Sequence, residues 1–296
     1  MKIENRQLDK FLRGHFKDEY ENFLNWAIYP LRPIIRVNTL KANIEDVYSR
    51  LTKKGFILSR IEFLDFAFRV EYYPSEIGNT LEHYLGYIYV QELSSMLPVI
   101  VLEPQEGELV LDLCASPGSK TTLISQFMNN KGVIVANDVS IDRTSALAFN
   151  VDRMGCINVV ITQFKGELFY KYYENYFDRV LVDVPCSAIG TIHKNKDIIK
   201  WWSYKKVKEF SKLQKSLIES GFKCLKRRGV LVYSTCTITK EENEEVIDYL
   251  IKKYDNLKIE KVSFPFEDYY YDSFGYGVYI RFGNFEPFYI SKIVKL

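Results

Sequence analysis

The sequence is poor in the features that mark secreted, membrane-spanning and zinc-stabilised proteins. Its five cysteines are odd in number and lack the paired short spacings of a zinc site, which argues against a disulfide framework and a structural metal. The first residues are polar and charged and do not resemble a signal peptide, and no apolar run is long enough to span a bilayer. We therefore expect a soluble cytoplasmic protein with free thiols, without a metal and without a membrane partner.

The sequence also has little excess of positive over negative charge, because the formal net charge of the 296 residues is only +2. The charge is nevertheless uneven: Lys and Arg outnumber Asp and Glu by twelve to three in residues 191–228, and by twelve to seven in residues 1–60. Basic segments of this kind favour a polyanionic partner such as nucleic acid. A solvated helix face is the alternative interpretation of a lysine-rich helix taken alone.

The order of apolar segments predicts two domains, and 47% hydrophobic residues are sufficient for a substantial core. Residues 1–85 are predicted to form a small α+β N-terminal RNA-binding domain, because their basic and aromatic content suits RNA, where aromatic side chains stack on bases. Packing of the strand Phe and Tyr side chains in the core is the alternative interpretation. Its expected elements are a helical stretch at 1–31, strands at 33–38, 56–61 and 66–72, and a helix at 43–54 that Asn43 caps.

Residues 86–296 are predicted to form the second domain. After a helical run at 87–102, strands and helices alternate, which predicts an α/β fold with a doubly wound, mostly parallel sheet. Tyr and Phe alternate in the tail at 262–294, so we expect an antiparallel C-terminal edge there. The expected strands are 109–113, 133–136, 159–162, a run ending at Asp183, and 230–233, and the expected helices are 120–128, 140–154, 203–225 and 239–253.

The run Val180-Leu181-Val182 is followed by polar groups in the order Asp183, Pro185, Cys186. A buried parallel strand that ends in this way delivers those groups to the edge where open α/β sheets place their sites. A strand-end turn with a buried thiol is the alternative, since free cysteine is among the most buried residue types.

A second apolar run ends at Cys236 and is followed by Thr239 and Glu242, whose spacing predicts a capping box that starts a helix. Cys236 would then lie between a strand end and a helix amino terminus, which favours a thiolate. Two cysteines at two strand ends of one sheet indicate a site and not a disulfide.

The first expected strand leads into a loop of small residues that opens a helix, and such loops let backbone amides approach a ligand. Asp138 follows the second strand, where an acid can accept both hydroxyls of a ribose. The dinucleotide pattern Gly-x-Gly-x-x-Gly is absent, and Ser119 separates Gly118 from Lys120, so a nucleoside cofactor without phosphates fits better. A tight turn without a ligand is the alternative. The candidate cofactor-binding residues of the loop are Cys114, Ala115, Ser116, Pro117, Gly118, Ser119 and Lys120.

Together these residues resemble the Sun/Fmu-type RNA cytosine-5 methyltransferases, which use S-adenosylmethionine and have a Rossmann-like methyltransferase domain. The matching segments are RVNTLK (36–41), QELSSM (91–96), DLCASPGSKT (112–121), DVPCS (183–187) and YSTCT (233–237) followed by EENE (241–244). The resemblance implies that the loop, Asp138 and Asp183 bind the cofactor and that Arg143 contacts it. The family usually has an acid near the adenine where Lys165 stands here.

The resemblance also implies a chemistry for the two cysteines. Cys236 would add to carbon 6 of cytosine so that carbon 5 can accept the methyl group, and Cys186 would help release the product. Asp183 would stabilise ring nitrogen 3 or hold the exocyclic amine, and Lys120 would orient Asp183. In DNA cytosine-5 enzymes the nucleophile follows the proline, which would nominate Cys186 instead.

The expected partner is RNA, with tRNA favoured because the chain is compact and rRNA still open, and the protein is expected to be a monomer. The target base must leave its stack, so unpaired nucleotides are favoured. A catalytically silent RNA- and nucleoside-binding module and methylation of adenine or protein are the alternatives. Candidate phosphate contacts are His193, Lys194, Lys196 and Lys200. Trp201 and Trp202 are candidates for base stacking, and packing at a helix start is the alternative favoured for at least one of them.

Overall fold

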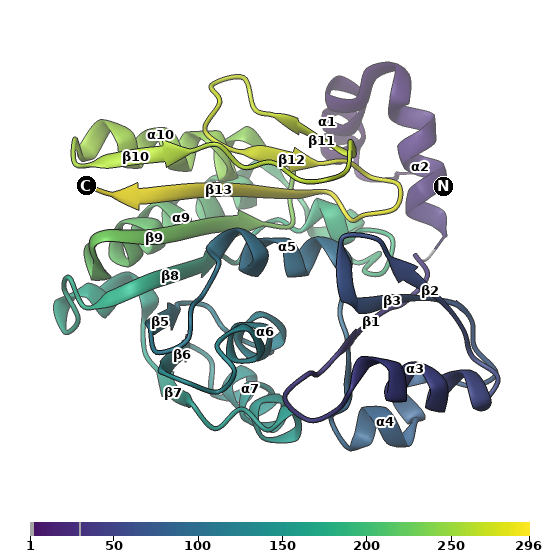
Figure 1. The fold of residues 1–296 in the computed structure, drawn as a ribbon. Coiled ribbons are helices and arrows are strands. Elements are labelled where there is room, and N and C mark those ends of the chain that lie inside the picture. Colours follow the sequence, from purple (N-terminus) through teal and green to yellow (C-terminus); the bar gives the residue numbers. More distant parts are fainter. Residues whose placement is uncertain (1–2, 30) are drawn as a thin grey trace.

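Two β-sheets organise the chain in the computed structural model, which describes residues 3–29 and 31–296 (Figure 1). The smaller sheet has four antiparallel strands in the order β2-β3-β1-β4. These strands are β1 (Ile34–Val37), β2 (Ile57–Ile61), β3 (Leu64–Tyr72) and β4 (Ile88–Val90). Helix α3 (Ile44–Lys53) packs on this sheet. As predicted, Asn43 caps it: the Asn43 side chain accepts hydrogen bonds from the backbone N–H groups of Glu45 and Asp46 in the first turn.

The larger sheet confirms the predicted doubly wound fold, with a parallel centre and an antiparallel C-terminal edge. Its strand order is β11-β12-β13-β9-β8-β5-β6-β7, with β10 paired to β13. The parallel strands are β5 (Leu109–Asp112), β6 (Val133–Asp138), β7 (Val159–Gln163), β8 (Phe177–Asp183) and β9 (Leu225–Thr235). The antiparallel strands are β10 (Leu257–Glu260), β11 (Tyr269–Tyr271), β12 (Val278–Ile280) and β13 (Phe288–Lys295).

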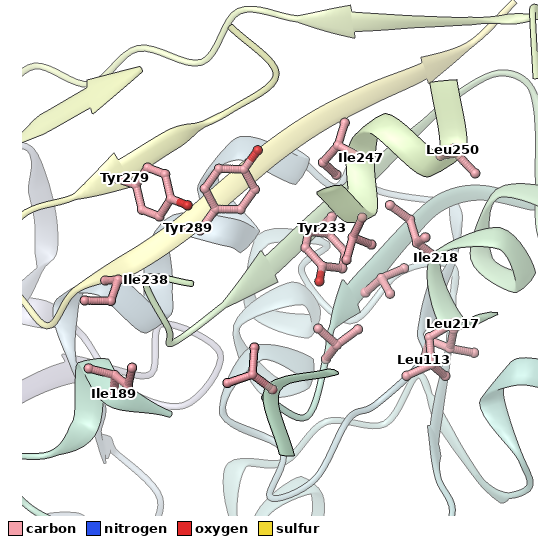
Figure 2. Packing of buried hydrophobic residues seen from close by; sticks show 14 of the residues in the cluster. Leu113, Ile189, Leu217, Ile218, Tyr233, Ile238, Ile247, Leu250, Tyr279 and Tyr289 are labelled. Carbon is pink, nitrogen blue, oxygen red and sulfur yellow. The ribbon is translucent and has the colours of Figure 1, made fainter. Parts of the chain in front are cut away.

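Helices cover both faces of the larger sheet because successive side chains of a strand point to opposite sides. In β8, Leu181 packs in the layer of helices α5 (Leu93–Leu102) and α6 (Ser119–Phe127). Val180 and Val182 pack in the opposite layer with α9 (Tyr204–Cys224) and α10 (Glu244–Lys253). Figure 2 shows part of this second layer, which includes Tyr233 of β9, Leu217 and Ile218 of α9, and Ile247 and Leu250 of α10. Helix α7 (Ile141–Met154) covers β6 in a further cluster.

The N-terminal helices α1 (Arg6–Phe16) and α2 (Tyr20–Ile28) lie beside the antiparallel edge of the larger sheet (Figure 1). Phe16 stacks on Phe23 and meets the edge of Phe282, which fastens this helical pair to the C-terminal tail. The remaining short elements are α4 (Leu81–Tyr84), α8 (Ile198–Trp201) and the 3-10 turns η1 (Lys17–Glu19), η2 (Ile77–Asn79), η3 (Gly166–Lys171), η4 (Ile189–Thr191) and η5 (Lys240–Glu242).

Two expectations from the sequence are corrected. The helix expected at 1–31 is broken into α1, η1 and α2, and residues 1, 2 and 30 of that stretch lie outside the described residues. The helix expected at 87–102 is wrong at its start, because β4 pairs with β1 and α5 begins only at Leu93. A short apolar run does not distinguish a buried strand from a helix by periodicity alone. The boundary at residues 85 and 86 stays a prediction.

Among the described residues, no helix is both long and apolar enough to cross a bilayer.

Candidate active site

The two cysteines at the strand ends meet. Strands β8 and β9 run parallel with Asp183 opposite Ser234, so the loops that follow them leave the same edge of the sheet. The sulfur atoms of Cys186 and Cys236 lie 3.3 Å apart, and both residues are half-buried. Two partly exposed thiols in contact at the carboxyl edge of the sheet can act on the same substrate in successive steps.

Asp183 ends β8 and is held from two sides. Its Oδ2 accepts a hydrogen bond from Nζ of Lys120 at 2.7 Å, and its Oδ1 accepts one from the hydroxyl of Ser234 at 2.7 Å. Lys120, in the first turn of α6, also donates to the hydroxyl of Ser95 at 3.0 Å. The ammonium group is therefore fixed between α5 and β8, and the carboxylate has one defined orientation.

The environment of Cys186 keeps its thiol protonated. The hydrogen bond with Cys236 raises the pKa of Cys186 well above its usual value, and burial of the thiol adds to the effect. A protonated Cys186 can donate a hydrogen bond to the sulfur of Cys236.

The predicted capping box at Thr239 is wrong. Glu242 does not accept the backbone N–H of Thr239, as a capping box requires; it accepts the hydroxyl of Thr239 and the backbone N–H and hydroxyl of Ser187. A 3-10 turn stands here, and α10 begins only at Glu244, after Asn243 has left helical backbone angles. The helix start thus lies farther from Cys236 than the sequence indicated, and the helix-dipole argument for its thiolate loses its basis.

The small-residue loop joins β5 to α6 and is packed against the end of β6. The backbone N–H groups of Ala115 and Ser116 donate to the carbonyl of Asn137 and to Oδ2 of Asp138. Gly118 has φ +100°, and a Cβ there would lie 2.9 Å from the Leu147 side chain, so no larger residue fits without displacement. Pro117 and Ser119 flank this glycine at the helix start.

Asp138, at the end of β6, and Arg143, in the first turn of α7, both contact Ser116 of this loop. Nη2 of Arg143 lies 3.3 Å from Oδ2 of Asp138 and donates to the carbonyl of Ser116 at 3.0 Å. Asp138 is 3% exposed and its Oδ1 also accepts the backbone N–H of Ser140. The structure therefore gathers the predicted cofactor residues around one loop, whereas Lys165 is exposed just beyond β7.

Sequence comparison decides the family. Residues 99–294 match the profile of the 16S rRNA methyltransferase RsmB/F family, and residues 8–93 match that of the N-terminal domain of the 16S rRNA methyltransferase RsmF. The chain belongs to the RsmB/F family. It is therefore an RNA methyltransferase, and the predicted cofactor of the family, S-adenosylmethionine, is confirmed.

Relatives of the RsmB/F chain include enzymes named for two kinds of RNA. A tRNA (cytosine(49)-C(5))-methyltransferase of Pyrococcus abyssi is 44% identical over 89% of this chain and 85% of its own length. The ribosomal RNA small subunit methyltransferase F of Vibrio parahaemolyticus is 42% identical over 84% of this chain. The chain spans 53% of that ribosomal enzyme, about half its length.

Solved structures show the same fold. The crystal structure of PH0851 superposes with a TM-score of 0.90 at 32% identity, over 97% of this chain and 65% of that one. The structure of NSun6 from Pyrococcus horikoshii gives a TM-score of 0.88 at 23% identity, over 98% of both chains.

Asp112 ends β5 and is the first residue of the segment DLCASPGSKT (112–121), and no role is predicted for it from the sequence. Its Oδ2 accepts the hydroxyl of Thr121 at 2.7 Å, whereas its buried Oδ1 has no partner among the described residues. Burial raises the pKa of Asp112 to about 7. Its place at a strand end beside the loop was the only signal in the sequence.

The expected phosphate contacts are only partly available. The prediction is wrong for His193, which is 5% exposed and has Nε2 3.3 Å from Oε1 of Glu286. Lys194 pairs with the same carboxylate at 2.6 Å, and Lys196 donates to the carbonyl of Ala27. Lys200 is exposed and paired with Asp197. Trp202, 1% exposed, is core and does not stack on bases, whereas Trp201 is partly exposed.

Proposed function

We propose that this chain transfers a methyl group from S-adenosylmethionine to carbon 5 of a cytosine in RNA, with tRNA favoured, through a covalent bond to Cys236. The observation that carries the proposal is the contact of Cys186 and Cys236 beside the ion pair of Asp183 and Lys120. Methylation of an exocyclic amine or of a protein requires no thiol, so a pair of thiols at this place favours carbon chemistry on a pyrimidine.

Carbon 5 of cytosine is a poor nucleophile, and addition of a thiolate to carbon 6 makes it enamine-like. Cys236 provides this thiolate. Addition places electron density on ring nitrogen 3. Asp183, held by Lys120 and Ser234, stabilises that position either as a protonated donor to nitrogen 3 or as a carboxylate that accepts a hydrogen bond from the exocyclic amine. The bound cofactor supplies the electrophilic methyl group. The proposed residues that hold it are the loop 114–120, Asp138, Arg143 and Asp183.

Product release requires loss of the proton on carbon 5. As a base removes that proton, the C–H electrons re-form the ring double bond, and the bond between carbon 6 and the sulfur of Cys236 breaks. Cys186 lies 3.3 Å from that sulfur and can assist the departing thiolate. In this proposal Cys236 forms the covalent bond to the base and Cys186 assists its release.

Transfer RNA is favoured because the Pyrococcus abyssi enzyme that is 44% identical over 89% of this chain is named for tRNA. Action on RNA in the cytoplasm as a monomer is part of the proposal.

The test uses purified protein, labelled S-adenosylmethionine and transcripts of tRNA and of 16S rRNA, followed by nucleoside analysis. We expect 5-methylcytidine in tRNA, and bisulfite sequencing of RNA from cells with and without the protein gives its position. Label in rRNA alone would replace the tRNA assignment with the rRNA alternative. Tight RNA binding without base-linked label would support the silent binding module.

A further inference from the structure

The carboxylate of Glu242 is fully buried and accepts four hydrogen bonds. Its Oε1 accepts the backbone N–H of Ser187 at 2.8 Å and Nε2 of Gln214 at 3.1 Å. Its Oε2 accepts the hydroxyls of Ser187 at 2.5 Å and of Thr239 at 2.6 Å. An ionised carboxylate has about four acceptor positions, so this arrangement uses its full capacity.

These bonds reach both cysteine loops. Ser187 follows Cys186, and its hydroxyl lies 2.8 Å from that of Thr237, which follows Cys236. Thr239 continues the Cys236 loop. The Glu242 side chain therefore connects the backbone next to Cys186 with the Thr239 side chain, three residues beyond Cys236.

Helix α9 supports the same connection. Nε2 of Gln214, which is also fully buried, donates both to Glu242 and to the carbonyl of Pro185 at 2.9 Å. Cys186 is thus flanked by two residues, Pro185 and Ser187, that are both tied to the pair formed by Glu242 and Gln214. Rotation of the Cys186 loop would break several of these bonds at once, and it would leave buried donors without acceptors.

The buried carboxylate of Glu242 is stabilised by hydrogen-bond donors and not by a cationic side chain in the part of the chain that the structure describes. Burial raises the pKa of Glu242 above its ordinary value, and the hydrogen bonds from Ser187, Thr239 and Gln214 offset only part of that rise. No cationic side chain among the described residues forms an ion pair with this carboxylate. Its energy therefore depends on the exact placement of the two loops that supply the donors.

We propose that Glu242 is a positioning residue that sets the spacing between the sulfur atoms of Cys186 and Cys236. The inference rests on the two-cysteine reaction proposed above. Glu242 lies behind the loops and acts through Ser187 and Thr239, without touching the substrate. Its effect falls on the steps in which both thiols take part, and not on the binding of RNA or cofactor.

The first experiment measures thiol spacing without RNA. The variants are Glu242→Ala and Glu242→Gln, and the matched control is Glu241→Gln, a neighbour whose side chain takes no part in the cluster. Diamide accepts two hydrogens and joins two nearby thiols as a disulfide, and mass spectrometry follows formation of the Cys186–Cys236 bond. We expect coupling about tenfold slower in Glu242→Ala, an intermediate rate in Glu242→Gln and no change in Glu241→Gln.

The second experiment measures kinetics on RNA. We expect kcat about a hundredfold lower in Glu242→Ala, with KM for RNA and cofactor within about threefold of the unmodified protein. Glu242→Gln keeps the volume of the side chain and serves if the alanine variant does not fold. Thiol coupling and kcat at the unmodified protein's values in Glu242→Gln and Glu242→Ala would overturn the proposal.

The two experiments separate this inference from the proposed function. Slower coupling in the Glu242 variants of a protein that makes no 5-methylcytidine would uphold the positioning role and reject the cytosine reaction. Normal coupling in variants of an active enzyme would reject the positioning role alone.

Discussion

The Sγ atoms of Cys186 and Cys236 lie 3.3 Å apart at the carboxyl ends of β8 and β9, although 50 residues separate them in the chain. This contact allows the roles of the two thiols to be tested separately. Cys236→Ala should abolish methylation and any covalent adduct, because the attacking sulfur is gone. Cys186→Ala should allow attack but trap a protein–RNA adduct that survives a denaturing gel. An adduct that persists in Cys236→Ala would reverse the assignment.

The ion pair of Lys120 and Asp183 should control the rate more than the binding of RNA. In Lys120→Met the carboxylate keeps Ser234 as its one side-chain hydrogen-bond partner among the described residues, so we expect kcat to fall about a hundredfold. The lost partner of a largely buried pair should also cost about 1–3 kcal/mol of unfolding free energy. Single-turnover methylation and urea denaturation measure the two effects.

The control for that variant is Lys131→Met, which removes an ion pair of the same length, 2.7 Å, on the exposed surface with Glu106. Exposed pairs contribute about 0–1 kcal/mol, so activity and stability should stay near the unmodified values. Equal losses of activity and stability in both variants would show that removal of a positive charge, and not its position beside Asp183, causes the effect.

Asp138→Asn should weaken cofactor binding by about tenfold or more, equivalent to about 1.4 kcal/mol, because an amide replaces an acceptor for ribose hydroxyls. Asp142→Asn changes an exposed acid nearby and is the matched control. Calorimetric titration with S-adenosylhomocysteine provides the dissociation constants. An unchanged constant in Asp138→Asn would remove Asp138 from the cofactor site.

Gly190 should not tolerate a side chain. Its N–H donates to the carbonyl of Cys236 at 2.9 Å, and an added Cβ would lie 2.1 Å from the carbonyl oxygen of Pro287. Gly190→Ala must therefore displace the backbone at Pro287, and it also crowds the carbonyl oxygen of Cys236 at 3.0 Å. We expect about 2 kcal/mol lower stability and about tenfold lower activity.

Gly14 is the matched control, because a Cβ there meets nothing within 4 Å in helix α1. Gly14→Ala should raise stability by up to about 1 kcal/mol through its better helix propensity. Thermal melts and initial rates of both variants decide the matter, and full activity in Gly190→Ala would contradict the argument.

The free energy of unfolding should fall in mild acid, because burial lowers the pKa values of His15 and His193 in the folded protein. Burial, with Lys240 nearby, lowers the pKa of His15 from 6.5 to about 4. The unfolded chain therefore binds a proton between these values while the folded chain does not, so stability is complete above pH 6.5 and declines as pH falls toward 4. His15 is only partly buried, and we expect its share to be about 1 kcal/mol at pH 5.

His15→Gln tests this share by urea denaturation at pH 7.5 and at pH 5. The variant should lose less stability between the two pH values than the unmodified protein. It should still lose some, because burial also lowers the pKa of His193 to about 4. An identical loss in both proteins would mean that His15 titrates normally.

Local sequence was sufficient for several features of this protein. Apolar runs and their polar ends located β5, β6, β8 and β9, and Asn43 marked the start of α3, because strand alternation and helix caps depend on neighbours a few residues away. The loop before α6 and the two cysteine segments also indicated the cofactor and the family. These features require no knowledge of how distant segments pack.

Only the tertiary structure brought Cys186 against Cys236, tied Lys120 to Asp183 and buried His193 against Glu286. It also decided that Glu242 binds Ser187 and does not cap a helix, although its spacing from Thr239 fits a capping box. The physical reason is that a buried carboxylate binds whichever donors the fold brings to it. Here the parallel register of β8 and β9 brings those donors from a loop 55 residues away in the chain.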